Sequence, residues 1–337
     1  MKRIATALAL GTLLAVGLAA CGDDVVDAGP VATDSSDTDA DDAGAPDDAD
    51  GTASGDGSSD PDAEADDATS GDGAQDGDAE EASGDADGDT AAVTLYYVAP
   101  GGDTDGRAGP FLVAVEREIP ATPGIAQATL RELIDGPSAA EATLVDGIAT
   151  SVPADTLVLG IDIADGLATV DLSREFESGG GSFSMFSRLA QVVYTATQFP
   201  TVDAVAFRLD GQPVEVFSGE GIVIDGAATR QDLIDLLPTV FVDTPAAGAE
   251  VSGGSLRMQG MATVFEATFQ YRLATADGEV IAEDFAMTDN GIGWGAFDVT
   301  IDYDVDSAQS AVLTVWEVSA RDGSIQAERA TPVTLRP

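Results

Sequence analysis

Carboxylates are the side chains with which this chain could most readily do chemistry. It carries 61 Asp and Glu against 14 Lys and Arg, with no histidine and a single cysteine. The absence of histidine excludes a Ser-His-Asp triad, a Cys-His pair and an imidazole metal site. Two carboxylates can hydrolyse a glycosidic bond without histidine, but among so many acids no pair stands out. We therefore expect no catalytic residues, no metal site and no cofactor.

Alternating acids in the N-terminal part raise the question of calcium binding. Asp85, Asp87 and Asp89 follow one another as the ligands of an EF-hand loop do. Such a loop needs glycine at its sixth position and a bidentate glutamate at its twelfth, where this chain has Thr90 and Tyr96. The tract is therefore expected to associate with divalent cations only diffusely.

The lone cysteine, Cys21, stands at the end of an apolar segment. Lys2 and Arg3 precede a run of 17 apolar or small residues that closes with Leu18, Ala19 and Ala20. A basic start, an apolar run and small residues before a cleavage point are typical of a secretory signal. The pattern looks like a bacterial lipobox, which implies that residues 1–20 are removed and that Cys21 is acylated. The alternatives are an ordinary signal peptide or an uncleaved membrane helix, for which the run is short.

The segment after the cysteine differs in composition from the rest. Residues 22–91 hold 25 acids and no base, and from residue 32 they contain no aromatic and no aliphatic side chain larger than alanine. Such a segment cannot bury enough apolar surface to offset its ordering entropy, so 21–91 is predicted to be a disordered acidic linker. The overall charge of −47 repels phosphates, which excludes nucleic-acid partners.

Residues 92–218 show the patterns of a small α+β domain. A helix is expected from a cap at Thr122 to a stop at Gly136, and another from Ser182 to Gln198. Alternating apolar runs predict strands at 93–98, 111–115, 157–163, 167–172, 202–209 and 214–217.

Several blocks of this region resemble the GerMN domain of sporulation and germination proteins. They are Tyr96-Tyr97-Val98, Leu133-Ile134-Asp135-Gly136-Pro137, Ser151-Val152-Pro153, Thr169-Val170-Asp171-Leu172-Ser173, and Thr195–Val202 followed by Leu209-Asp210-Gly211. The resemblance implies a compact α+β fold related to ring-building motifs and no established catalytic residues.

The last hundred residues have the patterns of a different fold. A connecting helix is expected within 219–238, and residues 239–337 carry seven short strand patterns separated by Gly, Asp and Pro turns. These patterns predict an antiparallel β-sandwich. The blocks Thr244–Val251, Gln259–Ala267, Gly295-Ala296-Phe297 and Ala320–Gly323 resemble the immunoglobulin-like Gmad2 domain, which commonly follows GerMN in bacterial lipoproteins.

Most residues of these blocks are expected to be structural, as turn and packing positions. We place in this group Gly136, Pro137, Val170, Asp171, Asp210, Gly211, Gly248, Gly260, Phe297, Asp322 and Gly323. Of the two tryptophans, Trp316 lies in an apolar strand and is expected in the core. Trp294 lies in a Gly-rich turn and is the better candidate for stacking on a ligand.

Together these patterns favour a non-catalytic lipoprotein outside the cytoplasmic membrane, anchored through Cys21. It would act as an interaction or assembly platform in the bacterial envelope, with envelope proteins or the cell wall as partners and oligomerisation left open. The runner-up is a binding module for peptidoglycan or another surface polysaccharide. A carboxylate-dependent wall hydrolase comes third.

Overall fold

The structure is a computed structural model that describes residues 88–337 except 102–106, 108 and 218–220. Residues 1–20 with the lipobox, the acylation candidate Cys21 and nearly all of the acidic linker lie outside the described residues. Among the described residues no helix is long and apolar enough to cross a membrane.

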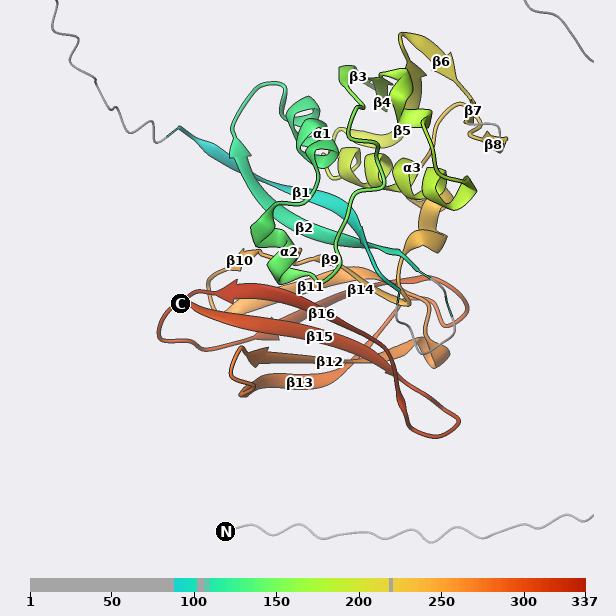
Figure 1. The fold of residues 1–337 in the computed structure, drawn as a ribbon. Coiled ribbons are helices and arrows are strands. Elements are labelled where there is room, and N and C mark those ends of the chain that lie inside the picture. The colour runs from blue at the N-terminus through green and yellow to red at the C-terminus, as the bar shows by residue number, and fades with distance from the viewer. Residues whose placement is uncertain (1–87, 102–106, 108, 218–220) are drawn as a thin grey trace, which may run out of the picture. The chain divides into compact units, whose positions relative to one another are not determined.

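In the first domain, helices lie between a β-ribbon and a sheet (Figure 1). The ribbon pairs β1 (Thr90–Ala99) with β2 (Phe111–Pro120) in antiparallel register, Leu95 opposite Val115. The helices are α1 (Ile125–Asp135) and α3 (Ser182–Ala196), and α3 is buried along most of its length. A helix buried on nearly all sides needs apolar cover on both faces, which the ribbon and the sheet supply.

The sheet has the strand order β3-β4-β5-β6. Its strands are β3 (Val158–Ala164), β4 (Gly166–Leu172), β5 (Val202–Leu209) and β6 (Gln212–Val214). Strands β3 and β4 form the expected hairpin, whereas β4 and β5 are parallel because the chain crosses over through η1 (Arg174–Glu177) and α3. Parallel neighbours require such a crossover.

Two local expectations for this domain are wrong. Helix α1 begins after Gly124 without a side-chain cap, so Thr122 does not cap it. Residues 214–217 are not one return strand, because β6 ends at Val214 and β7 (Val216–Phe217) pairs with β8 (Ile222–Val223). In addition, the short helix α2 (Ala139–Leu144) occupies a stretch expected to be a loop.

The connecting helix is a 3-10 helix, η2 (Gln231–Leu236). Its buried Leu233 and Leu236, followed by Leu237, belong to the same apolar core as the first domain. That core also includes Phe241, Ala246 and Ala247 from the second domain. The first core therefore continues across the connection.

The second domain is a two-sheet sandwich. One sheet has the order β14-β11-β9, and the other β10-β16-β15-β12-β13. The bounds are β9 (Val240–Thr244), β10 (Glu250–Val251), β11 (Ser255–Ala262), η3 (Phe265–Ala267), β12 (Thr268–Thr275), β13 (Val280–Met287), β14 (Gly295–Asp302), β15 (Gln309–Val318) and β16 (Ile325–Leu335).

The seven expected strands are present, with one difference in pairing. The additional strand β10 runs parallel to β16, so the sandwich is not wholly antiparallel. Phe269 and Phe297, with ring centroids 4.8 Å apart, join the two sheets in the core. An α+β domain followed by a β-rich domain is thus confirmed as the fold.

Candidate functional site

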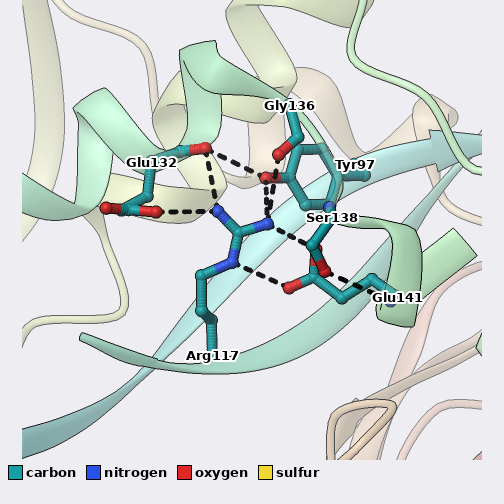
Figure 2. A network of polar contacts seen from close by, with 6 residues as sticks. All are labelled: Tyr97, Arg117, Glu132, Gly136, Ser138 and Glu141. Carbon is teal, nitrogen blue, oxygen red and sulfur yellow. Dashed lines mark hydrogen bonds and ion pairs between the residues drawn. The ribbon is translucent and has the colours of Figure 1, made fainter.

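Arg117 on β2 is the centre of a polar network in the first domain (Figure 2). Its guanidinium contacts both carboxylate oxygens of Glu141, with Nε 2.8 Å from Oε1, and its Nη1 lies 2.9 Å from Glu132 Oε2. The same group donates to the carbonyl of Gly136 over 3.1 Å and to the hydroxyl of Tyr97 over 3.2 Å. One arginine thereby ties the end of α1, the turn after it and α2 to the ribbon.

Burial makes this network strong and also closed to other partners. The side chains of Arg117 and Glu141 are 14% and 7% exposed. Desolvation alone would raise the pKa of Glu141, but hydrogen bonds from Arg117 and Ser138 outweigh it, and the pKa is lowered. Burial likewise raises the pKa of the Tyr97 hydroxyl, which Arg117 only partly opposes. The Glu141 carboxylate is therefore already fully engaged by Arg117 and Ser138.

A second network joins the two domains. Arg230 precedes η2, and its Nη1 lies 2.8 Å from Asp243 Oδ2 on β9. Its Nη2 donates to the Tyr96 hydroxyl over 3.0 Å, and that hydroxyl donates in turn to Asp243 Oδ1. Nε donates to Thr197 over 2.8 Å, and the guanidinium carbon lies 4.7 Å from the Tyr194 ring centroid. Strand β1, helix α3, the connection and the sandwich are thus held by one guanidinium.

The electrostatics of this joint resist ionisation of its phenols. Burial and the adjacent Asp243 carboxylate raise the pKa of Tyr96 well above its ordinary value, although Arg230 opposes the shift. Burial also raises the pKa of Tyr194. Both rings stay neutral at physiological pH and act as hydrogen-bonding and stacking groups.

Main-chain hydrogen bonds reinforce the joint. Ala247 N donates to the Ala114 carbonyl and Glu116 N donates to the Ala247 carbonyl, each over 2.9 Å, which adds a parallel bridge to β2. On its other side, Gly248 N donates to the Pro332 carbonyl over 2.8 Å. Gly248 has φ of 91°, a left-handed conformation that favours glycine. The segment therefore links the ribbon of one domain to the sandwich of the other.

A groove of about 310 Å³ opens beside Arg230 and Asp243. Gly260 and Phe297 line it. A Cβ added at Gly260 would stand 1.9 Å from the Phe241 carbonyl oxygen and 2.7 Å from Phe297 Cζ. Glycine here permits the close approach of β11 to β9. Because Asp243 is already paired with Arg230 and Tyr96, the groove suits an apolar side chain better than an acid-base reaction.

Trp294 is less exposed than its Gly-rich turn suggested, and its role as a stacking surface stays a prediction. It is partly buried and packs against the core of the first domain. The Arg107 guanidinium carbon lies 5.6 Å from its ring centroid and 5.0 Å from that of Phe111. Trp316 is 7% exposed, as expected. The guanidinium carbon of Arg272 lies 5.3 Å from its ring centroid and covers the ring.

Several motif residues shape turns. Gly136 is the C-cap of α1 and has φ of 86°, with Pro137 next, and Val170 is fully buried in β4. Asp171 accepts from Gly211 N over 2.9 Å, so it holds the Asp210-Gly211 turn.

A further motif pair shapes the hairpin between β15 and β16. Asp322 accepts from the Ser324 backbone N–H over 3.2 Å and from its hydroxyl over 2.7 Å. Gly323 has φ of 75° and donates to the Ser319 carbonyl over 2.8 Å. A left-handed glycine beside an Asp that binds its own backbone is typical of a turn.

Metal ligation finds no support in the described part of the chain. No group of three His, Cys, Asp or Glu side chains there could hold a metal ion.

The residues that form the two networks could not be paired from the sequence. They are Arg117, Glu132, Glu141, Arg230 and Asp243. One signal was available, because arginine is the sole basic residue type after residue 3. The arginines of the two networks, Arg117 and Arg230, are partly buried beside carboxylates, whereas the more deeply buried Arg188 donates to backbone carbonyls. Which carboxylate each one contacts depends on the tertiary fold.

Comparisons with known proteins agree with both domains. Residues 94–215 match the family Germane, sporulation and spore germination, and residues 239–324 match Gmad2, the immunoglobulin-like domain of bacterial spore germination. The chain is 28% identical over 158 residues to the spore germination protein GerM of Bacillus subtilis (strain 168), covering 47% of this chain and 40% of that protein.

It is also 28% identical over 138 residues to the lipoprotein LpqB of Thermobifida fusca (strain YX), covering 41% of this chain and 21% of that protein. The matched part thus spans less than half the length of either relative.

Solved structures include the first GerMN domain of GerM from Bacillus subtilis, at 26% identity and a TM-score of 0.34, with 42% of this chain and 99% of that one covered. The tandem GerMN domains of the same protein align at 17% identity and a TM-score of 0.36, and the alignment covers 74% of this chain and 61% of that one. The two family matches follow one another along the sequence without overlap. The chain therefore carries a region that matches the GerMN family and, after it, a region that matches the Gmad2 immunoglobulin-like family.

Proposed function

We propose that this protein is a non-catalytic lipoprotein of the bacterial envelope, held outside the cytoplasmic membrane by acylated Cys21, and that its two domains together form an interaction or assembly platform. The observation that carries the proposal is the joint between the domains. Arg230 contacts β1, α3 and β9 at once, and Ala247 bonds to the ribbon. Partners would then meet one continuous surface contributed by both domains.

The buried charges support the non-catalytic part of the proposal. Hydrolysis by carboxylates needs two acids free to reach a bond, one of them with a raised pKa. Glu141 and Asp243 are instead both engaged by arginines. Zymography on cell-wall material tests this point, and a cleared zone that disappears with a single carboxylate substitution would overturn it.

In vivo crosslinking of the full chain tests the platform role. A photoreactive amino acid replaces Met261, which is partly buried and lines the groove at the joint. We expect crosslinks to defined envelope proteins that disappear when Cys21→Ser removes the anchor. Crosslinks to wall polymer alone would instead favour the polysaccharide-binding alternative, and acyl labelling that persists in Cys21→Ser would refute the lipid anchor.

A further inference from the structure

The open edge of the first-domain sheet takes part in neither of the two networks and not in the joint between the domains. Strand β3 is the last strand of its sheet and pairs only with β4 among the described residues. The opposite edge strand, β6, has three residues and contains Pro213. A proline and a short length discourage pairing on an edge strand. Strand β3 has seven residues and neither proline nor lysine, and its register with β4 is regular from Gly160 to Ala164, after a shift between Val158 and Gly160.

The direction of the free backbone groups follows from the hairpin. A two-residue turn, Asp165 and Gly166, has φ of 52° and 82° and joins β3 to β4. In such a hairpin the residues next to the turn form the hydrogen-bonded pair, and the pairs then alternate along the ladder. Ala164 and Asp162 therefore bond to β4, whereas Ile163 and Ile161 direct their N–H and C=O groups to the open edge.

The side chains at this edge are suited to a partner strand. Leu157 is 60% exposed and Leu159 is 49% exposed. They line a hollow of about 490 Å³ between β3 and the last turn of α1. Pockets for alternate side chains beside a free edge are what strand-addition sites use for specificity.

Thr156 gives an independent sign that the hollow is a site. It lines the hollow and is only 3% exposed, yet its hydroxyl has no hydrogen-bond partner among the described residues. A buried hydroxyl without a partner is costly in a folded protein. A backbone group of a bound peptide could satisfy this hydroxyl after a small adjustment of the loop before β3.

Charge decides which occupant fits. Arg131 is outnumbered at this edge by the exposed Asp135, Asp155 and Asp162. A second copy of the folded region carries 36 acids against 12 arginines, and the linker carries 25 acids and no base. Both would be repelled. The complementary occupant is an extended segment in which aliphatic and basic residues alternate.

We propose that β3 binds such a segment of another protein by strand addition, with one aliphatic side chain in the hollow beside Thr156. This goes beyond the proposed platform role, which does not depend on the β3 edge.

The test uses the full chain in nanodiscs of neutral phosphatidylcholine, with a fluorescent heptapeptide of alternating lysine and valine as the probe. A second heptapeptide has proline in place of each valine, so its charge is the same but it cannot pair as a strand. Because their charges are equal, we expect both peptides to bind the acidic linker equally, so that the ratio of their affinities reports strand addition. At about 0.15 M salt we expect the valine peptide to bind about tenfold more tightly.

Variants of β3 locate the binding. Ile163→Pro removes a donor at the open edge and should bring the affinity ratio close to one, while Leu159→Ser should lower it about threefold. The control is Val280→Ser on β13, an edge strand of the sandwich, where the side chain is 51% exposed. Circular dichroism checks folding, and if Ile163→Pro does not fold, Leu159→Ser decides. An affinity ratio of one in the wild type, or a ratio that Leu159→Ser leaves unchanged, overturns the proposal while leaving crosslinking at the joint unaffected.

Discussion

Arg230 Nη1 and Asp243 Oδ2 lie 2.8 Å apart, and this ion pair joins the segment that connects the two domains to the first strand of the sandwich. The two side chains are 29% and 30% exposed. Tyr96 contacts both of them and is almost completely buried. If either Arg230 or Asp243 is removed, the remaining charge is left partly buried, with the Tyr96 hydroxyl beside it.

Arg230→Met should lower the free energy of unfolding by about 2 kcal/mol, because Asp243 then remains partly buried without its cation. Urea unfolding followed by fluorescence measures the change. The matched control is Arg257→Met, whose partner Asp298 and own side chain are 49% and 62% exposed, so this substitution should lower the free energy of unfolding much less. Equal losses in the two variants would contradict the role assigned to Arg230.

Gly260→Ala should destabilise the protein by about 3 kcal/mol, because its Cβ would lie 1.9 Å from the Phe241 carbonyl oxygen and β11 would have to move away from β9. Gly160→Ala is the control, since a Cβ at this strand position meets no atom within 4 Å. It should be neutral or slightly stabilising. Thermal unfolding of both variants decides, and a neutral Gly260→Ala would show that the two strands tolerate separation.

Long periodic segments could be predicted from the sequence, and short irregular ones could not. The stripe of α3 and the alternation of β12 and β14 are strong enough to place those elements. Helix α2 has six residues, too few for a periodic signal, yet Ser138 and Glu141 form its capping box. That spacing is readable in the sequence, and it was the signal available for α2.

The joint itself lies beyond local reasoning. Tyr96 and Arg230 are separated by 134 positions in the sequence, and Tyr96 and Asp243 by 147. No periodicity relates them, since their proximity follows from how the first core extends into the connection. Gly260 could be singled out as a motif position, but the reason for a glycine there, its close approach to the Phe241 carbonyl, becomes visible only with β9 in place.

Stability should fall below about pH 4.5, the ordinary pKa of a glutamate, partly through Glu141. Its pKa is lowered in the folded state, so its contribution is present above the unfolded pKa and is lost as the pH falls through the folded one. The urea concentration at the midpoint of unfolding, measured from pH 3 to pH 6 in steps of about half a pH unit, reports this loss of stability. Glu141→Gln should flatten the curve, because the substituted side chain has no carboxyl group to titrate. Parallel curves for wild type and Glu141→Gln would contradict the assignment.

At alkaline pH the tyrosines should report unfolding. Burial raises the pKa of Tyr96, Tyr97, Tyr194 and Tyr271 above the ordinary value of 10.0. Their contribution to stability is full below pH 10 and is lost above it, because the unfolded chain ionises first. In a spectrophotometric titration, the tyrosinate signal of these residues, four of the five in the chain, should rise together with the loss of circular dichroism. A signal that rises near pH 10 while the fold persists would contradict their burial.

Two buried threonines allow the hollow beside β3 to be compared with the core of the first domain. Thr156 lines the hollow, and Thr195 lies in helix α3. The Thr156 hydroxyl has no partner among the described residues, whereas Thr195 Oγ1 accepts from the buried Tyr96 N–H over 3.2 Å. Replacing a buried hydroxyl without a partner by a methyl group should raise the free energy of unfolding by up to about 1 kcal/mol, so Thr156→Val should be neutral or stabilising. Thr195→Val leaves a buried N–H without its acceptor and should cost about 1–2 kcal/mol. Urea unfolding of the full chain measures both, and a destabilising Thr156→Val would mean that its hydroxyl is already satisfied in the free protein and not kept for a bound strand.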